Sequence, residues 1–258
     1  MDILKTTGFD AAKEKDRVIE WIAGWFEENG KNAKAVIGIS GGKDSSITAA
    51  LCKEALGKDR VVGVLMPNGV QADIADSKNI VEKLGIQSLV INIEGPYKAM
   101  LSEFEKNFDK SNMTITRDLE INLPPRLRMS VLYGVAQSFK EGGRVANTCN
   151  RSEDYIGYST KYGDAAGDFS ALAGLTVSEV KAIGRLLDIP SYLVDKTPSD
   201  GLSGMSDEEK IGFSYDTLDR YILTGVCEDQ AIKEKIDRMH YLNLHKLKTI
   251  PYYLPEKG

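Results

Sequence analysis

The sequence predicts an α/β fold in which an open, parallel, five-stranded sheet carries helices on both faces. Two observations support this prediction. Short continuous apolar runs, typical of strands buried on both faces, alternate with longer segments whose apolar residues recur at helical spacing. The links between them are short, and a parallel strand pair needs a crossover connection that is usually a helix. Four of the five strands can be located from the sequence.

The first half of the chain alternates helix and strand. Glycines or prolines follow several of these segments and are natural stop signals, for example Gly30, Gly57 and Pro67. We expect helices at about 10–29, 47–57, 73–85 and 96–108, and strands at 33–40, 60–67 and 86–93.

The second half is less regular. Thr176 and Glu179 have the spacing of a capping box and predict a helix start. Three stretches are expected to be loops: an irregular first stretch, 109–125, which is a candidate mobile loop, a polar and weakly periodic second one, and a further irregular piece. No repeat or Pro/Gly/Ser-rich linker is evident, so one compact domain spanning 1–258 is favoured. We expect helices at 126–140, 176–187, 215–223 and 228–242, a strand at 143–148, and loops at 109–125, 149–174 and 196–210.

Composition excludes several classes of protein. The net charge of −5, from 33 basic and 38 acidic residues, argues against a nucleic-acid partner, which needs a basic surface. No run of about 18 apolar residues exists, so no membrane span is expected, and residues 1–17 do not resemble a signal peptide. Three widely separated cysteines favour a reduced, cytoplasmic location. With only two histidines, a His-rich metal centre is not expected.

The most informative segment is Ser40-Gly41-Gly42-Lys43-Asp44-Ser45-Ser46, between a predicted strand and a helix start. Glycines let the backbone turn sharply, and the amides of a helix N-terminus together with serine hydroxyls can hold anionic oxygens. Asp44 inside such a loop would repel phosphates unless a divalent cation lay between them, so it is predicted to bind Mg²⁺. The alternative is a tight turn in which Asp44 caps the helix.

This segment resembles the signature of the PP-loop ATP pyrophosphatases, which have a Rossmann-like, adenine nucleotide alpha hydrolase-like fold and cleave ATP between the α and β phosphates. The second half is similar to the NAD synthetase family within that superfamily. The matching segments are Asn147–Glu153, Ser159–Asp164, Gly174–Thr176, Lys196–Leu202, Gly212–Asp216 and the pair His245-Lys246.

The resemblance implies a set of site residues. Asp44 and Glu153 would bind Mg²⁺ and serve catalysis, with Glu153 in a loop after the fourth strand. Asp168 is a candidate proton acceptor for ammonium. The residues implied to bind ATP are Gly38, Ile39, Ser40, Gly41, Gly42, Lys43, Asp44, Ser45, Ser46, Thr148 and Ser199; those implied to bind deamido-NAD are Arg128, Lys161, Asp168, His245 and Lys246.

Some of these residues have structural alternatives. Arg128 could belong to a solvated helix face, Asp168 could cap a turn, and His245 and Lys246 could simply favour a helix dipole. One position departs from the family: Val177 stands where many relatives have a lysine that contacts ATP phosphates. Lys181 and Lys43 are the candidates to replace that lysine.

The implied activity is the ATP-dependent amidation of deamido-NAD by ammonia, the last step of NAD biosynthesis, through an NAD-adenylate and with release of AMP and pyrophosphate. Glutamine-using relatives have an additional amidohydrolase domain, and 37 residues precede the loop, so we expect no glutaminase domain and free ammonia as donor. The resemblance also implies a homodimer whose substrate site uses both subunits. Two alternatives are disfavoured: a tRNA-thiolating ligase by the acidic composition, and a non-catalytic ATP-binding regulator by the two candidate metal carboxylates.

Overall fold

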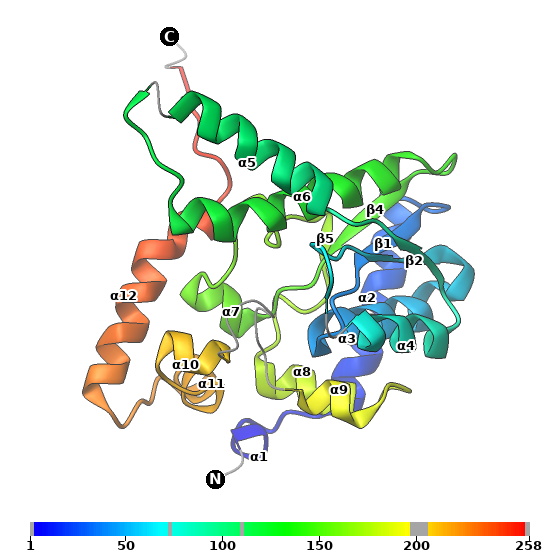
Figure 1. Ribbon diagram of the computed structural model, residues 1–258. Helices are drawn as coiled ribbons and strands as arrows, with labels where there is room; N and C mark the ends of the chain where they lie inside the picture. Colours follow the sequence, from blue (N-terminus) through cyan, green and yellow to red (C-terminus); the bar gives the residue numbers. More distant parts are fainter. Residues whose placement is uncertain (1–2, 72–73, 109–110, 197–205, 256–258) are drawn as a thin grey trace.

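The computed structural model describes residues 3–71, 74–108, 111–196 and 206–255. Within these ranges, five parallel strands form one sheet in the order β3-β2-β1-β4-β5, with helices packed around it (Figure 1). The predicted fold class is therefore confirmed. The strands are β1 (Lys34–Gly38), β2 (Val61–Leu65), β3 (Gln87–Val90), β4 (Gly143–Asn147) and β5 (Phe169–Ser170).

Helices cover both faces of the sheet, as the continuous apolar strands require. They lie in the chain order that the sequence predicts, with additional short helices. The helices are α1 (Ile3–Thr7), α2 (Ala11–Asn29), α3 (Lys43–Leu56), the 3₁₀ turn Lys58–Arg60, α4 (Ile74–Leu84), α5 (Glu94–Phe108), α6 (Arg117–Gln137), α7 (Arg151–Ile156), α8 (Val177–Gly184), α9 (Ser191–Asp195), α10 (Asp207–Ile211), α11 (Tyr215–Thr224) and α12 (Gln230–Leu247).

The side chains of β1 show how the two faces are filled. Ala35 and Ile37 join the apolar cluster formed with α2, α3, α4 and α8, whereas Val36 joins the cluster formed with α6. This alternation follows from the two-residue period of a strand. In Figure 1, α5 and α6 lie above the sheet and α2, α3 and α4 lie below it.

A third apolar cluster lies away from the sheet. Ile156 of α7, Val177 of α8, Leu218 of α11 and Ile236 of α12 are all buried there. The C-terminal helices thus pack against α7 and α8, the two elements that follow strands β4 and β5. This cluster connects the end of the chain to the carboxyl edge of the sheet.

Several element predictions differ from the structure. The end of the loop predicted at 196–210 belongs to α10, which Ser206 caps, and α12 ends at Leu247, five residues later than expected. Residues 117–125 are helical and begin α6, because Thr116 caps the helix through Leu119 N and buried Leu123 and Pro124 compensate for its two prolines. The predicted loop at 149–174 contains α7 and β5, since Asn150 caps α7 and Phe169 and Ser170 pair with β4. Helix α3 begins at Lys43, four residues earlier than expected.

No helix in the described part of the chain is long and apolar enough to cross a bilayer. This agrees with the absence of a long apolar run in the sequence.

Candidate active site

The loop between β1 and α3 has the backbone and hydroxyl groups of an anion-binding turn. Gly41 adopts φ +77°, and a Cβ there would lie 3.0 Å from Ser77 Oγ and 3.1 Å from Ser77 N. Glycine is therefore required both by conformation and by the close approach of α4. Ser40 Oγ accepts a hydrogen bond from Gly42 N, and Ser46 Oγ donates to Gly42 O.

The N-terminus of α3 faces this loop without a side-chain cap. Gly42 is the N-cap residue, and no side chain caps the helix there. The first amides of a helix carry a partial positive charge and need acceptors, so an uncapped N-terminus that follows a glycine turn can accept phosphate oxygens. The alternative in which Asp44 caps α3 is not what the structure shows. The geometry fits the predicted ATP-phosphate role of the loop from Gly38 to Ser46, which stays a prediction.

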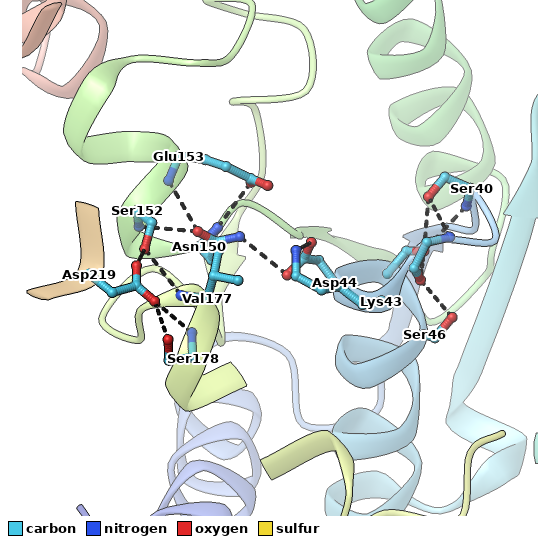
Figure 2. A network of polar contacts seen from close by, with 12 residues as sticks. Ser40, Lys43, Asp44, Ser46, Asn150, Ser152, Glu153, Val177, Ser178 and Asp219 are labelled. Carbon is cyan, nitrogen blue, oxygen red and sulfur yellow. Dashed lines mark hydrogen bonds and ion pairs between the residues drawn. The ribbon is translucent and has the colours of Figure 1, made fainter. Parts of the chain in front are cut away.

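Glu153 lies on a helix and not in a loop, which corrects the sequence expectation. It is the third residue of α7, and its carboxylate accepts from Asn150 N while Asn150 Oδ1 accepts from Glu153 N. This reciprocal pair is a capping box, and it fixes the first turn of α7. Asn150 also donates through Nδ2 to Asp44 Oδ1, at 3.2 Å, so one amide links the phosphate loop to α7 (Figure 2).

The two predicted magnesium ligands thus come together with a buried lysine. Lys43 is 3% exposed, and its Nζ lies 2.6 Å from Asp44 Oδ2. Burial alone would lower the pKa of Lys43, but Asp44 and Glu153 outweigh it and the pKa is raised. Burial, followed by the charge of Asp44, raises the pKa of Glu153 to about 8. The carboxylates therefore destabilise each other's charge, and a cation placed between them would relieve that repulsion.

A buried carboxylate that sequence reasoning missed supports α7 from behind. Asp219 of α11 accepts hydrogen bonds from Ser152 Oγ and, at 2.7 Å, from Ser178 N at the start of α8 (Figure 2). Ser152 Oγ in turn accepts from Val177 N. Asp219 is fully buried, so its three donors hold α7, α8 and α11 together. A charged residue on the apolar face of a predicted helix was the available sequence signal.

Two other side chains near the carboxylates were also missed. Tyr158 donates to Asp207 Oδ1 at 3.1 Å. Burial and the charges of Glu153 and Asp207 raise the pKa of Tyr215. Its hydroxyl is buried without a hydrogen-bond partner among the described residues. Tyr158 lies in the predicted loop at 149–174 and its partner Asp207 in the predicted loop at 196–210, where periodicity gave no signal, whereas Tyr215 is the first residue of the helix predicted at 215–223.

The residues predicted to bind the dinucleotide come from several parts of the chain. Lys161, His245 and Lys246 are brought together by α12: Lys161 Nζ donates to His245 O, and Lys246 Nζ donates to Gly157 O and Ser159 O, next to α7. On α6, Arg128 Nε donates to Met66 O just beyond the carboxyl end of β2. Burial, partly offset by Asp164, lowers the pKa of Arg128.

Both carboxylate oxygens of Asp168 accept hydrogen bonds within the fold. Its Oδ2 accepts from Val145 N of β4 and its Oδ1 accepts from Tyr133 OH. Both oxygens are therefore used by the fold, although its substrate-binding and proton-accepting roles stay predictions. Thr148 is partly exposed just after β4, and Ser199 lies outside the described residues.

At the position that departs from the family, Val177 is buried in the C-terminal apolar cluster and contributes only its backbone amide to this network. Asp44, Glu153 and Asp207 form a carboxylate cluster around Lys43, which is one of the two candidate replacements for the missing lysine.

Comparison with known proteins decides the family. The family model described as NAD synthase matches residues 15–254, nearly the whole chain. The chain belongs to the NAD synthase family. Its curated relatives include the NH(3)-dependent NAD(+) synthetases of Pyrococcus horikoshii, 40% identical over 86% of this chain and 82% of the relative, and of Thermococcus sibiricus, 38% identical over 93% and 91%.

Solved structures of NAD synthase relatives share the fold. The NMN synthetase of Francisella tularensis superposes with a TM-score of 0.85 at 30% identity, covering 95% of this chain and 99% of that one. The NH3-dependent NAD synthetase of Campylobacter jejuni has a TM-score of 0.75 at 26% identity, covering 96% and 100%. These likenesses agree with the overall fold described above.

Proposed function

We propose that the protein catalyses the ATP-dependent amidation of deamido-NAD by ammonia and forms NAD, AMP and pyrophosphate. Membership of the NAD synthase family and the names of the curated relatives support this activity. ATP is the co-substrate, and the names of those relatives also support ammonia as the nitrogen donor.

The observation that carries the proposal is the meeting of Asp44 and Glu153 beside an uncapped helix N-terminus. They are distant in sequence, yet the Asn150 amide bonds to Asp44 and caps the helix that bears Glu153. Amides that attract phosphates and carboxylates that attract a cation are what the cleavage of a nucleoside triphosphate requires.

The donor chemistry of this cluster fits Mg²⁺. Its side chains offer carboxylate oxygens, which Mg²⁺ prefers, and Glu153 and Asp44 repel each other when both are charged. No group of three or more His, Cys, Asp or Glu residues in the described ranges is arranged to hold a metal alone. That also suits Mg²⁺, which is commonly bound by one or two carboxylates plus substrate phosphates. When bound, the ion would stabilise the charge of the departing pyrophosphate.

The reaction needs two substitutions, and the chain's residues serve both. First, a nicotinate carboxylate oxygen attacks the α phosphorus of ATP and pyrophosphate leaves; the loop amides and Lys43 would position the phosphates. Then ammonia attacks the activated carbonyl carbon, AMP leaves with the former carboxylate oxygen, and the nitrogen loses a proton. Arg128, Lys161 and Lys246 are basic groups suited to the anionic dinucleotide.

A coupled assay tests this function. The protein is incubated with ATP, Mg²⁺, deamido-NAD and ammonium, and AMP and NAD are measured. Both products should appear together, and each should need all four components. AMP formation that does not depend on deamido-NAD would contradict the proposal.

A second candidate acceptor is nicotinate mononucleotide. The observation that favours it is the likeness to the Francisella tularensis NMN synthetase, which has a higher TM-score than the NAD synthetase structures compared with it. Both acceptors carry the nicotinate carboxylate, and only deamido-NAD carries the adenylyl half as well. Parallel assays at equal acceptor concentration distinguish them, since the preferred acceptor is the one with the higher kcat/KM.

We further propose that each chain forms one NAD synthase domain, that two chains form a homodimer, and that the substrate site lies at the subunit interface. Exposed apolar side chains support this assembly: Tyr241 and Leu242 on α12, and Tyr252, Tyr253 and Leu254 beyond it. Light scattering coupled to size-exclusion chromatography should give twice the chain mass. A cytoplasmic location stays a prediction.

A further inference from the structure

Lys43 lies beside a carboxylate that we propose binds Mg²⁺, and a magnesium site does not itself require a lysine there. It is the residue between the glycine pair and Asp44, and its side chain is 2% exposed. Instead of extending to solvent, it turns into the carboxylate cluster, and its Nζ bonds to Asp44 Oδ2. A lysine so deeply buried is retained only when opposite charges pair with it.

The carboxylate that Lys43 holds is the one that the metal would need. Asp44 Oδ1 accepts from Asn150 Nδ2 and Oδ2 accepts from Lys43 Nζ, so both of its oxygens already have donors (Figure 2). The negative charges of Glu153 and Asp207 also stabilise the Lys43 ammonium group. The cluster therefore contains its own cation, on one of the two Asp44 oxygens that a divalent ion would approach, and the Asn150 amide occupies the other.

The charges predict the order in which ligands can enter. A divalent cation that approached the empty cluster would meet the Lys43 ammonium at close range and in a poorly solvated place, where repulsion is strong. The negative charges of ATP change this balance, because phosphate oxygens at the loop attract both the metal ion and the ammonium. The ammonium can then exchange a carboxylate partner for a phosphate partner.

We propose that Lys43 is a built-in cation that guards Asp44, so that Mg²⁺ enters this site together with ATP and not before it. The inference rests on the proposed function only in assuming that the loop binds ATP. Lys43 would thereby contact phosphate in the loaded site, which is the role that Val177 cannot perform.

The experiment measures metal binding rather than turnover. Mn²⁺ replaces Mg²⁺, and the signal of the free ion in electron paramagnetic resonance gives its affinity with and without α,β-methylene-ATP, which cannot be cleaved at the relevant bond. For the unaltered protein, we expect the analogue to tighten Mn²⁺ binding by about tenfold or more.

The decisive variant is Lys43→Met, which keeps the length of the side chain and removes its charge. Mn²⁺ alone should bind it about tenfold more tightly than the unaltered protein, and the gain from the analogue should shrink. Lys34→Met, which removes a lysine whose Nζ donates to Asp59 O, is the matched control and should bind Mn²⁺ like the unaltered protein. Asp44→Asn should weaken Mn²⁺ binding with and without the analogue.

Several results would overturn the proposal: a Lys43→Met variant that binds Mn²⁺ alone no more tightly, or an Asp44→Asn variant with unchanged Mn²⁺ affinity. If Lys43→Met does not fold, Lys43→Gln replaces it. If neither folds, the unaltered protein decides, and a gain from the analogue below twofold contradicts the proposal. Failure of the amidation assay with an intact Mn²⁺ result would refute the proposed function and leave this inference standing.

Discussion

The loop between β1 and α3, which carries the predicted phosphate-binding residues, and the helix α7 form two sides of the candidate active site. They are stabilised differently. The loop mostly uses its own groups: most of its hydrogen bonds join residues no more than five positions apart, such as Ser40 with Ser45, although Asn150 Nδ2 and Lys196 Nζ also reach it from distant segments. Helix α7 depends on distant elements: Asp219 of α11 holds Ser152, and Lys246 of α12 donates to Gly157 O. The candidate site thus combines a turn that is formed mainly by local hydrogen bonds with a helix whose position depends on contacts from distant elements.

The largest expected effect is on the loop side and is chemical. Asp44→Asn removes the charge that we propose binds Mg²⁺ while leaving an amide of the same shape, so AMP formation should fall about 1000-fold. Thermal stability should fall as well, because Asp44 pairs with buried Lys43 and accepts a hydrogen bond from Asn150 Nδ2, so AMP formation is measured well below the unfolding temperature of the variant. Asp59→Asn, at an exposed carboxylate, is the control and should retain activity. Near-normal activity of Asp44→Asn would remove Asp44 from the proposed metal site.

The matching change on the other side is structural. Asp219→Ala leaves buried hydroxyls and the Ser178 amide without their acceptor, so the free energy of unfolding should fall by about 3 kcal/mol. Activity should fall as well, since α7 carries Glu153. Denaturant unfolding and the AMP assay measure the two effects. Asp216→Asn, an exposed carboxylate on the same helix, should cost under about 0.5 kcal/mol. Equal stability of the two variants would contradict the supporting role of Asp219.

A third change tests how tightly the loop is built. Gly41→Ala places a Cβ in a left-handed conformation and against Ser77, so it should cost about 2 kcal/mol of stability and raise the KM for ATP. Gly85→Ala is a matched control, because Gly85 has φ +64° but open space around its Cβ position. It should cost only about 1 kcal/mol and leave the KM unchanged. A KM equally raised in both variants would contradict the role of close packing at Gly41.

The smallest expected effect concerns Asp154 of α7. Burial, followed by the charge of Asp164, raises its pKa from 3.8 to about 6 in the folded protein. The folded state therefore binds this proton more tightly than the unfolded state, and stability falls as pH rises from about 4 through 6. Asp154→Asn should be about 1 kcal/mol more stable at pH 7.5, allowing for its partial exposure, and should gain little at pH 4. Denaturant unfolding at both pH values measures the difference. A gain that is the same at both values would contradict this assignment.

The sequence predicted most of the sheet because its signals are local. Apolar runs marked β1, β2, β3 and β4, and β1 combined with the glycine pair marked the phosphate loop. The two-residue strand β5 was not located, since two residues give no period and Phe169 and Ser170 become a strand only by pairing with β4. The irregular reading of 117–125 failed for a related reason: helix-breaking prolines were outweighed by a cap and by buried contacts.

By itself, the sequence determined the fold class and the glycine turn after β1, and its resemblance to the NAD synthetase family predicted an anion-binding role for that turn and a joint role for Asp44 and Glu153. These rest on strand patterning, on glycine conformation and on motifs with fixed spacing. Only the tertiary structure decided that Lys43 turns inward onto Asp44, that Asn150 joins the loop to α7, and that Asp219 supports α7 from behind. The reason is physical: burial and charge pairing depend on which distant segments pack together, and no local pattern encodes that arrangement.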